Sequence, residues 1–367
     1  MTAQPAVPIF ATADGQAQDF YLPRFELHSR GKDLPSEVVS DVTQVSYGDD
    51  LGQIDHCEIT LSNWDDERNT FSHSDTDRFL PGRMIELWLG YQGPGRMRRV
   101  ITAEITALRP SFPSGGQPTL VVSGLNVLHR LRRAQRTQIY QNLTPTQIAR
   151  RIGDLMKVQM RTAPLAEQPY DYLIQNTYDV VFLMDLARRS GYELYVEEQP
   201  GAGGRPVVFF GASERLHRVT YKLHYGASLI EFQPTLTTTR QVGSVVVRGW
   251  DRRTKKPIEV TVKRSELKLG SADDELEPAF NQRAEVITAV IADQAEARRL
   301  ARDRLRDIAH ETVTATGSTV GLPDLRAGSL IEVSGVGRRF SGKYFVTAST
   351  HTLGSGGYTT SFTCRRD

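Results

Sequence analysis

Two distant stretches of the sequence, Gly82-Arg83-Met84-Ile85-Glu86-Leu87 and Gly328-Ser329-Leu330-Ile331-Glu332-Val333, share one pattern of glycine, apolar and acidic positions. At nearly the same distance behind them, Val100-Ile101-Thr102-Ala103 matches Phe345-Val346-Thr347-Ala348. Self-similarity usually marks a tandem array, but these two copies lie far apart in the chain. The pattern therefore predicts two versions of one β-domain. Chance similarity between two β-hairpins is the alternative.

The residues around each copy also favour a β-domain. Each copy ends in a glycine-rich turn and one more short strand, at residues 119–122 and 358–362. In the first third of the chain, alternating apolar and polar residues predict strands at 25–28, 57–61, 84–89, 100–108 and 120–122. Turn-forming residues separate them at 48–50, 90–95 and 113–116. Short strands with regular turns are typical of a barrel or sandwich, and duplicated barrels suit a closed ring with two equivalent positions per chain.

The pattern changes to helix near residue 144. Thr144-Pro145-Thr146-Gln147 predicts a helix start with a capping box. The apolar stripe expected behind it consists of Ile148, Ile152, Leu155 and Met156. A second helix is expected over residues 178–190, with Gly191 as its stop. Residues 192–197 and 207–210 then predict a hairpin, so the middle of the chain is expected to be a small α+β unit.

The β pattern returns near residue 219. Strands are expected at 229–232, 242–250, 258–262, 329–333, 343–351 and 358–364. The acidic stretch at 267–285 is expected to be a surface loop or insertion. One further helix, residues 293–310, begins with Asp293 and Glu296 in a capping box. Its expected buried stripe is Ala297, Leu300, Ala301, Leu305 and Ile308, with Arg298, Arg299, Arg302 and Arg306 facing solvent.

These patterns predict a mainly β, α+β protein with two β-barrels and a small α+β unit between them. We expect a flexible N-terminal arm (1–19), a first barrel (20–131) and an α+β middle domain (132–218). The second barrel (219–367) is expected to include the helix at 293–310 and a loop insertion near 265–290. A chain of 367 residues is too long for one compact core, which agrees with several domains.

Composition narrows the function. The formal net charge is +2, from 45 basic and 43 acidic residues, which argues against nucleic-acid binding as the main activity. The two cysteines, Cys57 and Cys364, have no CxxC partner and are interpreted as buried free thiols. The N-terminus lacks the basic and apolar segments of a signal peptide, and no apolar stretch could span a bilayer. Folding in the cytoplasm is therefore expected.

No catalytic, cofactor or metal constellation is predicted, and interface or lumen residues are left unassigned because they require the strand register. His56 and Cys57 are adjacent, so in a strand they point to opposite faces. The other histidines lack metal-ligand spacing, and Gly335-Val336-Gly337 is read as a hairpin turn. Arg130, Arg132, Arg133 and Arg136 are expected to contact partner proteins or cargo. A helix-turn-helix is the weaker alternative, because the next helix starts only near residue 178.

Three groups of motifs together resemble the late control protein D family, the baseplate hubs of contractile phage tails. The first runs from Gly90-Tyr91 through Pro110-Ser111-Phe112-Pro113 to Val122-Ser123-Gly124 and the arginine-rich run at 128–140. The second runs from Gln175-Asn176-Thr177 to Gly191-Tyr192. The third comprises Val247-Arg248-Gly249-Trp250-Asp251, Gly321-Leu322-Pro323-Asp324-Leu325 and Phe340-Ser341-Gly342-Lys343-Tyr344. The chain is more distantly similar to the hub part of valine-glycine-repeat spike proteins of type VI secretion.

This resemblance implies two tube-type barrels per chain and a homotrimeric ring that joins the six-fold inner tail tube to a central spike. The implied partners are the spike protein, the inner tube protein and other baseplate subunits, without a membrane anchor, cofactor or specific nucleic acid. The protein would be made in the bacterial cytoplasm and then become part of a tail or injection particle. Because the sequence stops after the second barrel, the spike is expected to be a separate chain. A hub with added peptidoglycan hydrolase activity and a DNA-contacting tail component are the alternatives.

Overall fold

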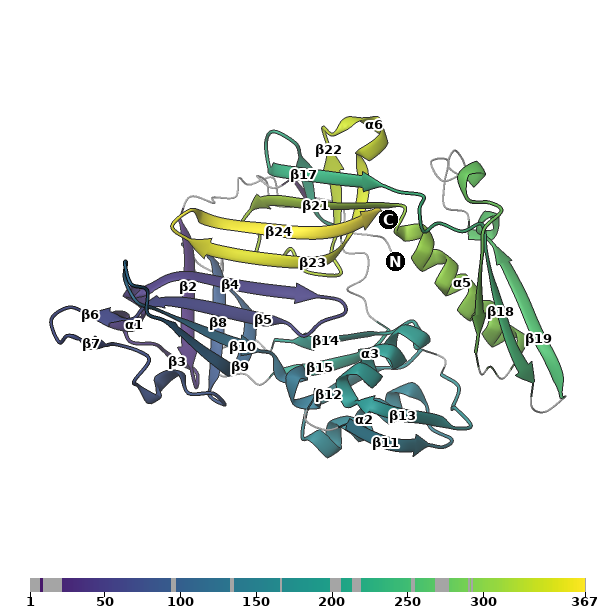
Figure 1. The fold of residues 1–367 in the computed structure, drawn as a ribbon, viewed down its shortest axis with the longest axis horizontal. Helices are drawn as coiled ribbons and strands as arrows, with labels where there is room; N and C mark the ends of the chain where they lie inside the picture. Colours follow the sequence, from purple (N-terminus) through teal and green to yellow (C-terminus); the bar gives the residue numbers. More distant parts are fainter. Residues whose placement is uncertain are drawn as a thin grey trace.

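The computed structural model describes residues 7–8, 22–93, 97–132, 135–165, 167–198, 206–212, 219–251, 255–267, 277–289, 291 and 293–366. A broad layer of strands occupies the upper left of Figure 1, a unit with two helices lies below it, and a third unit lies on the right. The fold is mainly β with additional helices, as the sequence predicts.

The first β-unit uses seven strands from the first third of the chain. They are β2 (Pro23–Ser29), β3 (Lys32–Asp33), β4 (Val42–Asp50), β5 (His56–Ser62), β8 (Met84–Tyr91), β9 (Met97–Ser111) and β10 (Thr119–Leu125). Their order is β4-β5-β10-β9-β8-β2-β3, and each pair is antiparallel. The shorter elements α1 (Ser36–Ser40), β6 (Trp64–Asp65) and β7 (Thr70–Phe71) lie in the connections. Ile59, Leu87 and Ile101 are in the core between them.

The second β-unit uses six strands from the end of the chain. They are β16 (Val219–His224), β17 (Leu229–Leu236), β21 (Val313–Val320), β22 (Leu330–Ser334), β23 (Gly342–Gly354) and β24 (Gly357–Arg366). Their order is β16-β22-β23-β24-β21-β17, with the short helix α6 (Gly337–Phe340) between β22 and β23. Within the expected N-terminal arm, the structure describes only β1 (Val7–Pro8), which pairs in parallel with β16.

Five strands of the two β-units are equivalent. β4, β5, β8, β9 and β10 correspond in chain order and pairing to β17, β21, β22, β23 and β24. Gly82 and Gly328 have φ of 92° and 90°, in the left-handed region that favours glycine. The Gly82 amide donates to the carbonyl of Ile105 on β9, and the Gly328 amide donates to the carbonyl of Val346 on β23, both at 2.8 Å. The predicted duplication is therefore present in the fold, although β16 is parallel to β22 whereas β2 is antiparallel to β8.

The second half of the predicted repeat is out of register. Met84 pairs with Glu104, and its counterpart Leu330 pairs with Phe345. The structure therefore makes Phe345 on β23 the counterpart of Glu104 on β9, an offset of 241 residues. The sequence match of 100–103 with 345–348 implied an offset of 245 and is wrong by four residues. The structure aligns Thr106 with Thr347, each skipped by a β-bulge. Their hydroxyls donate to Ser123 and Thr363 at 3.4 and 3.2 Å. A bulge of this kind is a built feature of a fold, and sequence similarity alone did not locate it.

The middle unit follows the first β-unit. The helices α2 (Pro145–Met156) and α3 (Asp179–Ser190) pack on β12 (Met160–Ala163), β14 (Glu193–Glu197) and β15 (Val207–Gly211), and a ribbon is formed by β11 (Gln135–Tyr140) and β13 (Leu173–Tyr178). The predicted helix starts, the stop at Gly191 and the antiparallel β14–β15 pair are confirmed. Ile148 and Ile152 are buried, but Leu155 is 51% exposed, because it lies off the stripe that faces the sheet.

Replacing Thr144 by alanine should lower the free energy of unfolding by about 1 kcal/mol. Its hydroxyl accepts from the Gln147 amide, and the Gln147 side chain accepts from the Thr144 amide, which completes the predicted capping box. Urea unfolding followed by circular dichroism measures the change. Thr261→Ala, at an exposed position outside the middle unit, is the matched control and should change stability by less than about 0.5 kcal/mol. Equal losses in both variants would contradict the role of the cap.

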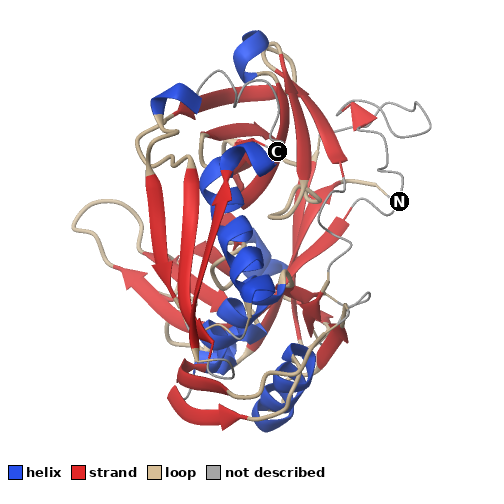
Figure 2. Cartoon of the chain, turned by 90° about the vertical axis from the view of Figure 1, so that its right-hand side faces the viewer, coloured by secondary structure: helices blue, strands red, loops and turns tan. Residues whose placement is uncertain are grey.

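The inserted unit interrupts the second β-unit between β17 and β21. It consists of β18 (Ser244–Asp251), β19 (Lys256–Lys263), β20 (Ala284–Thr288) and α5 (Gln294–His310). The predicted hairpin and helix are confirmed, with Asp293 capping α5 and Ala297, Ala301 and Leu305 buried against the sheet. Figure 2 views this unit from the front, with α5 along one face of the strands. Residues 284–288, expected to lie in a loop, instead form β20, because β18 offers them a parallel edge.

Candidate functional site

One pair of strands joins the two β-units. β4 is antiparallel to the C-terminal half of β23, from Asp50 opposite Ala348 to Gln44 opposite Gly354. Because β4 also pairs with β5 and β23 with β24, the two units and β1 form a single sheet of 14 strands (Figure 1). We call the β4–β23 junction the seam. Residues 48–50, expected to form a turn, are thus the end of β4.

A buried ion pair lies at the seam. Nε of Arg326 donates to Oδ2 of Asp49 at 2.8 Å, and the amide of Ala327 donates to the same oxygen at 3.1 Å. The guanidinium also contacts the Tyr47 hydroxyl and lies over its ring, 4.4 Å from the centroid. Burial raises the pKa of Asp49, but Arg326 and the Ser349 hydroxyl lower it further, and the pKa ends below its usual value. Asp49 is therefore a carboxylate that holds Arg326 by charge and hydrogen bonds.

This ion pair connects the two β-units directly. Arg326 precedes β22 of the second unit, whereas Asp49 lies on β4 of the first. Nη1 of Arg326 also donates to the carbonyl of Val100 on β9 at 3.2 Å. One side chain of the second β-unit thus contacts two strands of the first, which restrains the angle between the units as well as the register of the seam.

His351 extends the network along β23. Its Nε2 lies 3.3 Å from the hydroxyl of Ser349, which contacts Asp49, and 3.1 Å from the carbonyl of Leu325. Its Nδ1 lies 3.1 Å from the Tyr358 hydroxyl. Burial lowers the pKa of His351 to about 4, so the ring is neutral at pH 7. Because a carbonyl can only accept, the hydrogen of the neutral ring belongs on Nε2.

A second contact between the units lies beside this network. The hydroxyl of Tyr91, on β8, donates to the carbonyl of Gly321 at 2.8 Å, and the rings of Tyr91 and Tyr358 are 5.7 Å apart. A Cβ on Gly321 would lie 2.1 Å from the Tyr358 ring, so this position has no room for a side chain. The hydrogen bond and ring contact of Tyr91 pack the first β-unit against the second, and Gly321 lets the backbone that Tyr91 reaches lie close to the Tyr358 ring.

The opposite face of the fused sheet carries small polar side chains. Side chains alternate along a strand, so the neighbours of Asp49, Ser349 and His351 point away from the buried network. The observed pairing places in one row, across six strands, Thr359, Thr352, Ser46, Glu58, Ser123 and Ala107. We define the polar face as Gln44, Ser46, Glu58, Thr60, Thr119, Ser123, Thr314, Thr316, Ser318, Thr350, Thr352, Thr359, Ser361 and Thr363. None of these side chains is fully buried.

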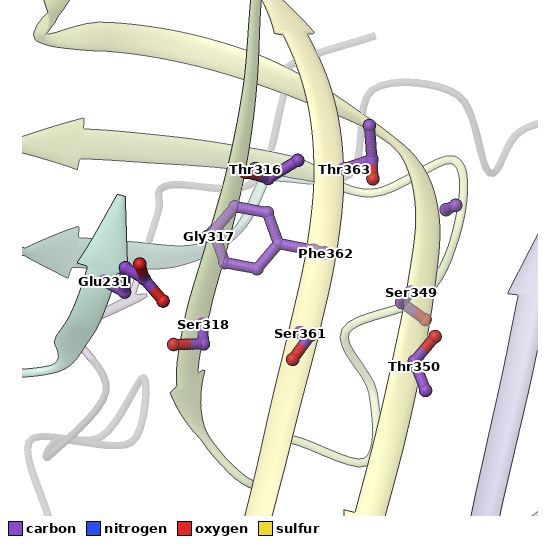
Figure 3. Close-up of a pocket in the computed structure, with 10 residues that line it drawn as sticks. Glu231, Thr316, Gly317, Ser318, Ser349, Thr350, Ser361, Phe362 and Thr363 are labelled. Carbon is purple, nitrogen blue, oxygen red and sulfur yellow. The ribbon is translucent and has the colours of Figure 1, made fainter. Parts of the chain in front are cut away.

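Part of the polar face is hollowed over β21, β24 and β23. Figure 3 shows the hydroxyls of Thr316, Ser318, Thr350 and Ser361 around this hollow, which measures about 260 Å³. Hydroxyl groups hydrogen-bond readily to water. Phe362 and Glu231 also line the hollow. The residues of the polar face as defined include no large apolar side chain, and their one carboxylate, Glu58, pairs with Arg109. Such a surface is suited to remain wet and to bind a passing protein weakly.

Glu198 attaches the middle unit to the first β-unit. Its carboxylate accepts from the amide and hydroxyl of Thr102 at 2.8 and 2.6 Å. It also lies 3.3 Å from Nε of the buried Arg99, which is 3.3 Å from Glu86. The middle unit is therefore fixed to β8 and β9 by charged hydrogen bonds.

The arginine cluster is used differently from the prediction. Arg130 donates to Glu104 at 2.8 Å, and Arg136 donates to the buried Asp179 at 3.1 Å. Internal carboxylates thus satisfy both side chains, so these two are not free for partners or cargo. Arg132 is exposed, whereas Arg133 lies outside the described residues.

The histidines and cysteines take separate places. His56 is exposed and Cys57 is buried, as expected for neighbours in a strand. Among the described residues, no group of His, Cys, Asp or Glu side chains is arranged to hold a metal ion. His217 is not among the described residues. The seam network was not singled out from the sequence, because its members are ordinary strand residues that meet only through long-range pairing.

Comparison with solved structures defines the class of fold. The fold is shared with the 43 kDa tail protein of prophage MuSo2 from Shewanella oneidensis, at TM-score 0.69 and 15% identity over 94% of this chain and 98% of that one. It is also shared with a tail protein from Neisseria meningitidis MC58, at TM-score 0.69 and 15% identity over 95% and 97%. The c3393 protein of E. coli, a type VI secretion component described as similar to T4 tail proteins gp27 and gp5, matches at TM-score 0.60 and 14% identity over 93% and 77%.

The chain therefore has a phage-tail protein fold, and the predicted resemblance to baseplate hubs is confirmed at that level. The family model described as the Alg8 N-terminal domain matches residues 21–355, and the chain belongs to this family. No curated protein matches the sequence. Among the described residues, no helix has the length and apolar character needed to cross a membrane.

Proposed function

We propose that the protein is a structural baseplate hub subunit that forms a trimeric ring and joins a six-fold inner tail tube to a central spike. The ring would belong to a contractile phage tail or injection system. The observation that carries this proposal is the seam. It holds two equivalent β-units side by side in one sheet, as two successive positions of a ring would be held.

Symmetry explains why a chain of this design suits the junction. Three chains with two equivalent β-units each would present six similar positions to a six-fold tube and three to a spike. The polar face would then line the channel, where wet hydroxyls let cargo or tube contents pass. In this proposal residues 20–131 and 219–367 are the tube-type barrels, and residues 132–218 with the inserted unit lie outside the channel.

The proposed work of the ring is mechanical, without catalysis by this chain. The seam supports this role, because a buried ion pair and a strand ladder resist a change of angle between the β-units. The spike, the inner tube protein and other baseplate subunits are the proposed partners. The ring would travel with the tube on contraction and deliver the spike.

Light scattering of the purified chain, alone and mixed with its candidate spike protein, tests the proposal. We expect a particle with the mass of three 41.0 kDa chains in the first sample, or of three such chains plus the bound spike in the second. Electron micrographs of that particle should show a ring with six similar lobes around a channel. A monomer in both samples, at concentrations well above those in an assembling tail, would overturn the proposal.

A further inference from the structure

Two strand edges of the fused sheet have no neighbour among the described residues. β9 bonds to β8 and to the residues just before it only as far as Ile105, so residues 106–111 use only the side that faces β10. β17 pairs with β21 along one side, and on the described residues its only other bridge is an isolated one at Leu229. Both edges carry partly exposed apolar residues: Phe112 is 57% exposed beyond β9, and Phe232 is half-buried on β17. Open edges of this kind readily accept another strand.

The internal repeat identifies what belongs on these edges. β9 is equivalent to β23, with Thr106 and Thr347 at the same bulge. β4 is equivalent to β17, and there too a bulge skips matching residues, Thr43 and Ile230. Within the chain β23 pairs with β4. The counterparts of these two strands, β9 and β17, are the two open edges.

We propose that β9 of one chain pairs with β17 of the next chain, in the register that the seam sets. This inference rests on the proposed ring and specifies the contact between its chains. We replaced each residue in the β4–β23 pairs by its counterpart in the repeat, on β17 and β9 respectively. This places Leu108 opposite Leu236, Ser111 opposite Gln233, and Phe112 opposite Phe232. Ser111 pairs with Thr119 and Gln233 with Thr316, and both threonines belong to the polar face. A row of that face would then continue from one chain to its neighbour.

The buried side chains at the seam and at the proposed β9–β17 contact support this assignment. Asp49, Ser349 and Arg326 of the seam correspond to Leu236, Leu108 and Leu80. Leu80 is equivalent to Arg326 because each makes the same turn. The Leu80 carbonyl accepts from the Arg83 amide at 3.1 Å, and the Arg326 carbonyl accepts from the Ser329 amide at 3.0 Å. The polar seam network is thus replaced by three leucines. Leu80 is 42% exposed in the single chain, and Leu108 and Leu236 are half-buried. Three apolar side chains at matching places are what a contact between chains would bury.

Two prolines shape this contact. Pro110 and Pro234 would lie opposite each other, at the place of His351 and Tyr47 in the seam. Both lie on the open edge, where a missing amide hydrogen leaves the ladder within each chain intact. The junction between chains would therefore have fewer backbone hydrogen bonds than the seam and depend more on the leucines and phenylalanines. Prolines on an edge also discourage pairing with unrelated strands.

A cysteine pair tests the register. Seam geometry makes Ser111 and Gln233 a close, non-hydrogen-bonded pair with Cα atoms about 4.5 Å apart, within reach of a disulfide. Oxidation of the Ser111→Cys/Gln233→Cys variant should give covalent dimers and trimers on denaturing, non-reducing gels. The native cysteines are buried, and each single variant controls for them. Ser111→Cys/Thr237→Cys, displaced by about 13 Å along the strand, is the register control and should stay uncrosslinked.

A charge exchange tests the packing. Leu236→Asp should weaken trimer formation by about 100-fold or more, because it buries an unpaired carboxylate at each junction. Adding Leu80→Arg recreates the Asp49–Arg326 pair between chains and should restore most of the trimer. Leu165→Asp, at a residue 69% exposed in the middle unit, is the matched control and should leave the trimer unchanged.

The outcomes separate this inference from the proposed function. Crosslinks in the matched pair alone, with loss and rescue of the trimer, would support both. A trimer that survives Leu236→Asp and gives no matched crosslink would overturn the β9–β17 contact while the ring stands. A wild-type chain that remains monomeric with its spike partner would overturn both.

Discussion

Replacing Arg326 by alanine is expected to lower the free energy of unfolding by about 3 kcal/mol. The change leaves Asp49 buried and charged, with its cation and one hydrogen bond removed. It also releases the Val100 carbonyl and the face of the Tyr47 ring. Urea unfolding measures the loss. Hydrogen exchange on β4 and β23 should show that the seam opens first.

The double variant Asp49→Leu/Arg326→Leu separates the ion pair from simple packing. Removing both charges avoids the unpaired carboxylate, and replacing a buried pair by apolar residues is often neutral or stabilising. The repeat already carries leucine at both equivalent positions, Leu236 in the second β-unit for Asp49 and Leu80 in the first for Arg326. We therefore expect stability close to that of the wild type. A double variant as unstable as Arg326→Ala would contradict our account of the seam.

Local patterns in the sequence predicted the local structure well. Thr144-Pro145-Thr146-Gln147 forms the capping box it indicated, and Gly191 ends α3 in the left-handed conformation. The hairpin of β18 and β19 and the helix α5 are also where apolar periodicity placed them. Each of these signals lies within a few residues of the structure it determines, which explains why it can be read from the chain.

The seam could not be predicted in this way. Gly48-Asp49-Asp50 has turn chemistry, yet β23 offers β4 a partner edge from the other end of the chain, and pairing overrides the local preference. Val45, Tyr47 and Asp49 are buried at alternate positions, which is a strand signal in retrospect. Arg326 gave no signal, because only the pairing of strands 300 residues apart brings it to Asp49. The glycine and threonine residues of β21 likewise gave no strand signal in the sequence, because pairing with β17 and β24 stabilises this strand.

The repeat can be recognised in the sequence only where its two copies need the same backbone conformation or face equivalent cores. Gly82 and Gly328 both need a positive φ, and the apolar positions after them face equivalent cores. Where the two β-units have different neighbours, their residues diverge. The polar Asp49 and Arg326 stand at a junction within one chain, and Leu236 and Leu80 stand at an open edge. Divergence at such positions therefore carries information about assembly.

Stability is expected to fall by about 3 kcal/mol between pH 6.5 and pH 4, because of His351. Burial lowers the pKa of His351 to about 4 in the folded protein, whereas the unfolded chain titrates near its usual 6.5. Between these values the unfolded state binds the additional proton, so stability rises with pH in this window and is lost as pH falls. The titratable and charged groups around the ring are Asp49, Arg326, Tyr47 and Tyr358. Asp49 has a lowered pKa, so it adds its own loss only at more acidic pH.

Unfolding in urea at several pH values, for the wild type and His351→Gln, measures this dependence. Glutamine can still donate to the Leu325 carbonyl but does not titrate, so the variant should lose stability at pH 7 and depend less on pH between 4 and 6.5. The Asp49→Leu/Arg326→Leu variant should keep the dependence, because its histidine is still buried. A wild type that is equally stable at pH 4.5 and 6.5 would contradict a buried, neutral His351. Since this ring lies beside the ion pair that joins the two β-units, protonating it should loosen the seam before either unit unfolds.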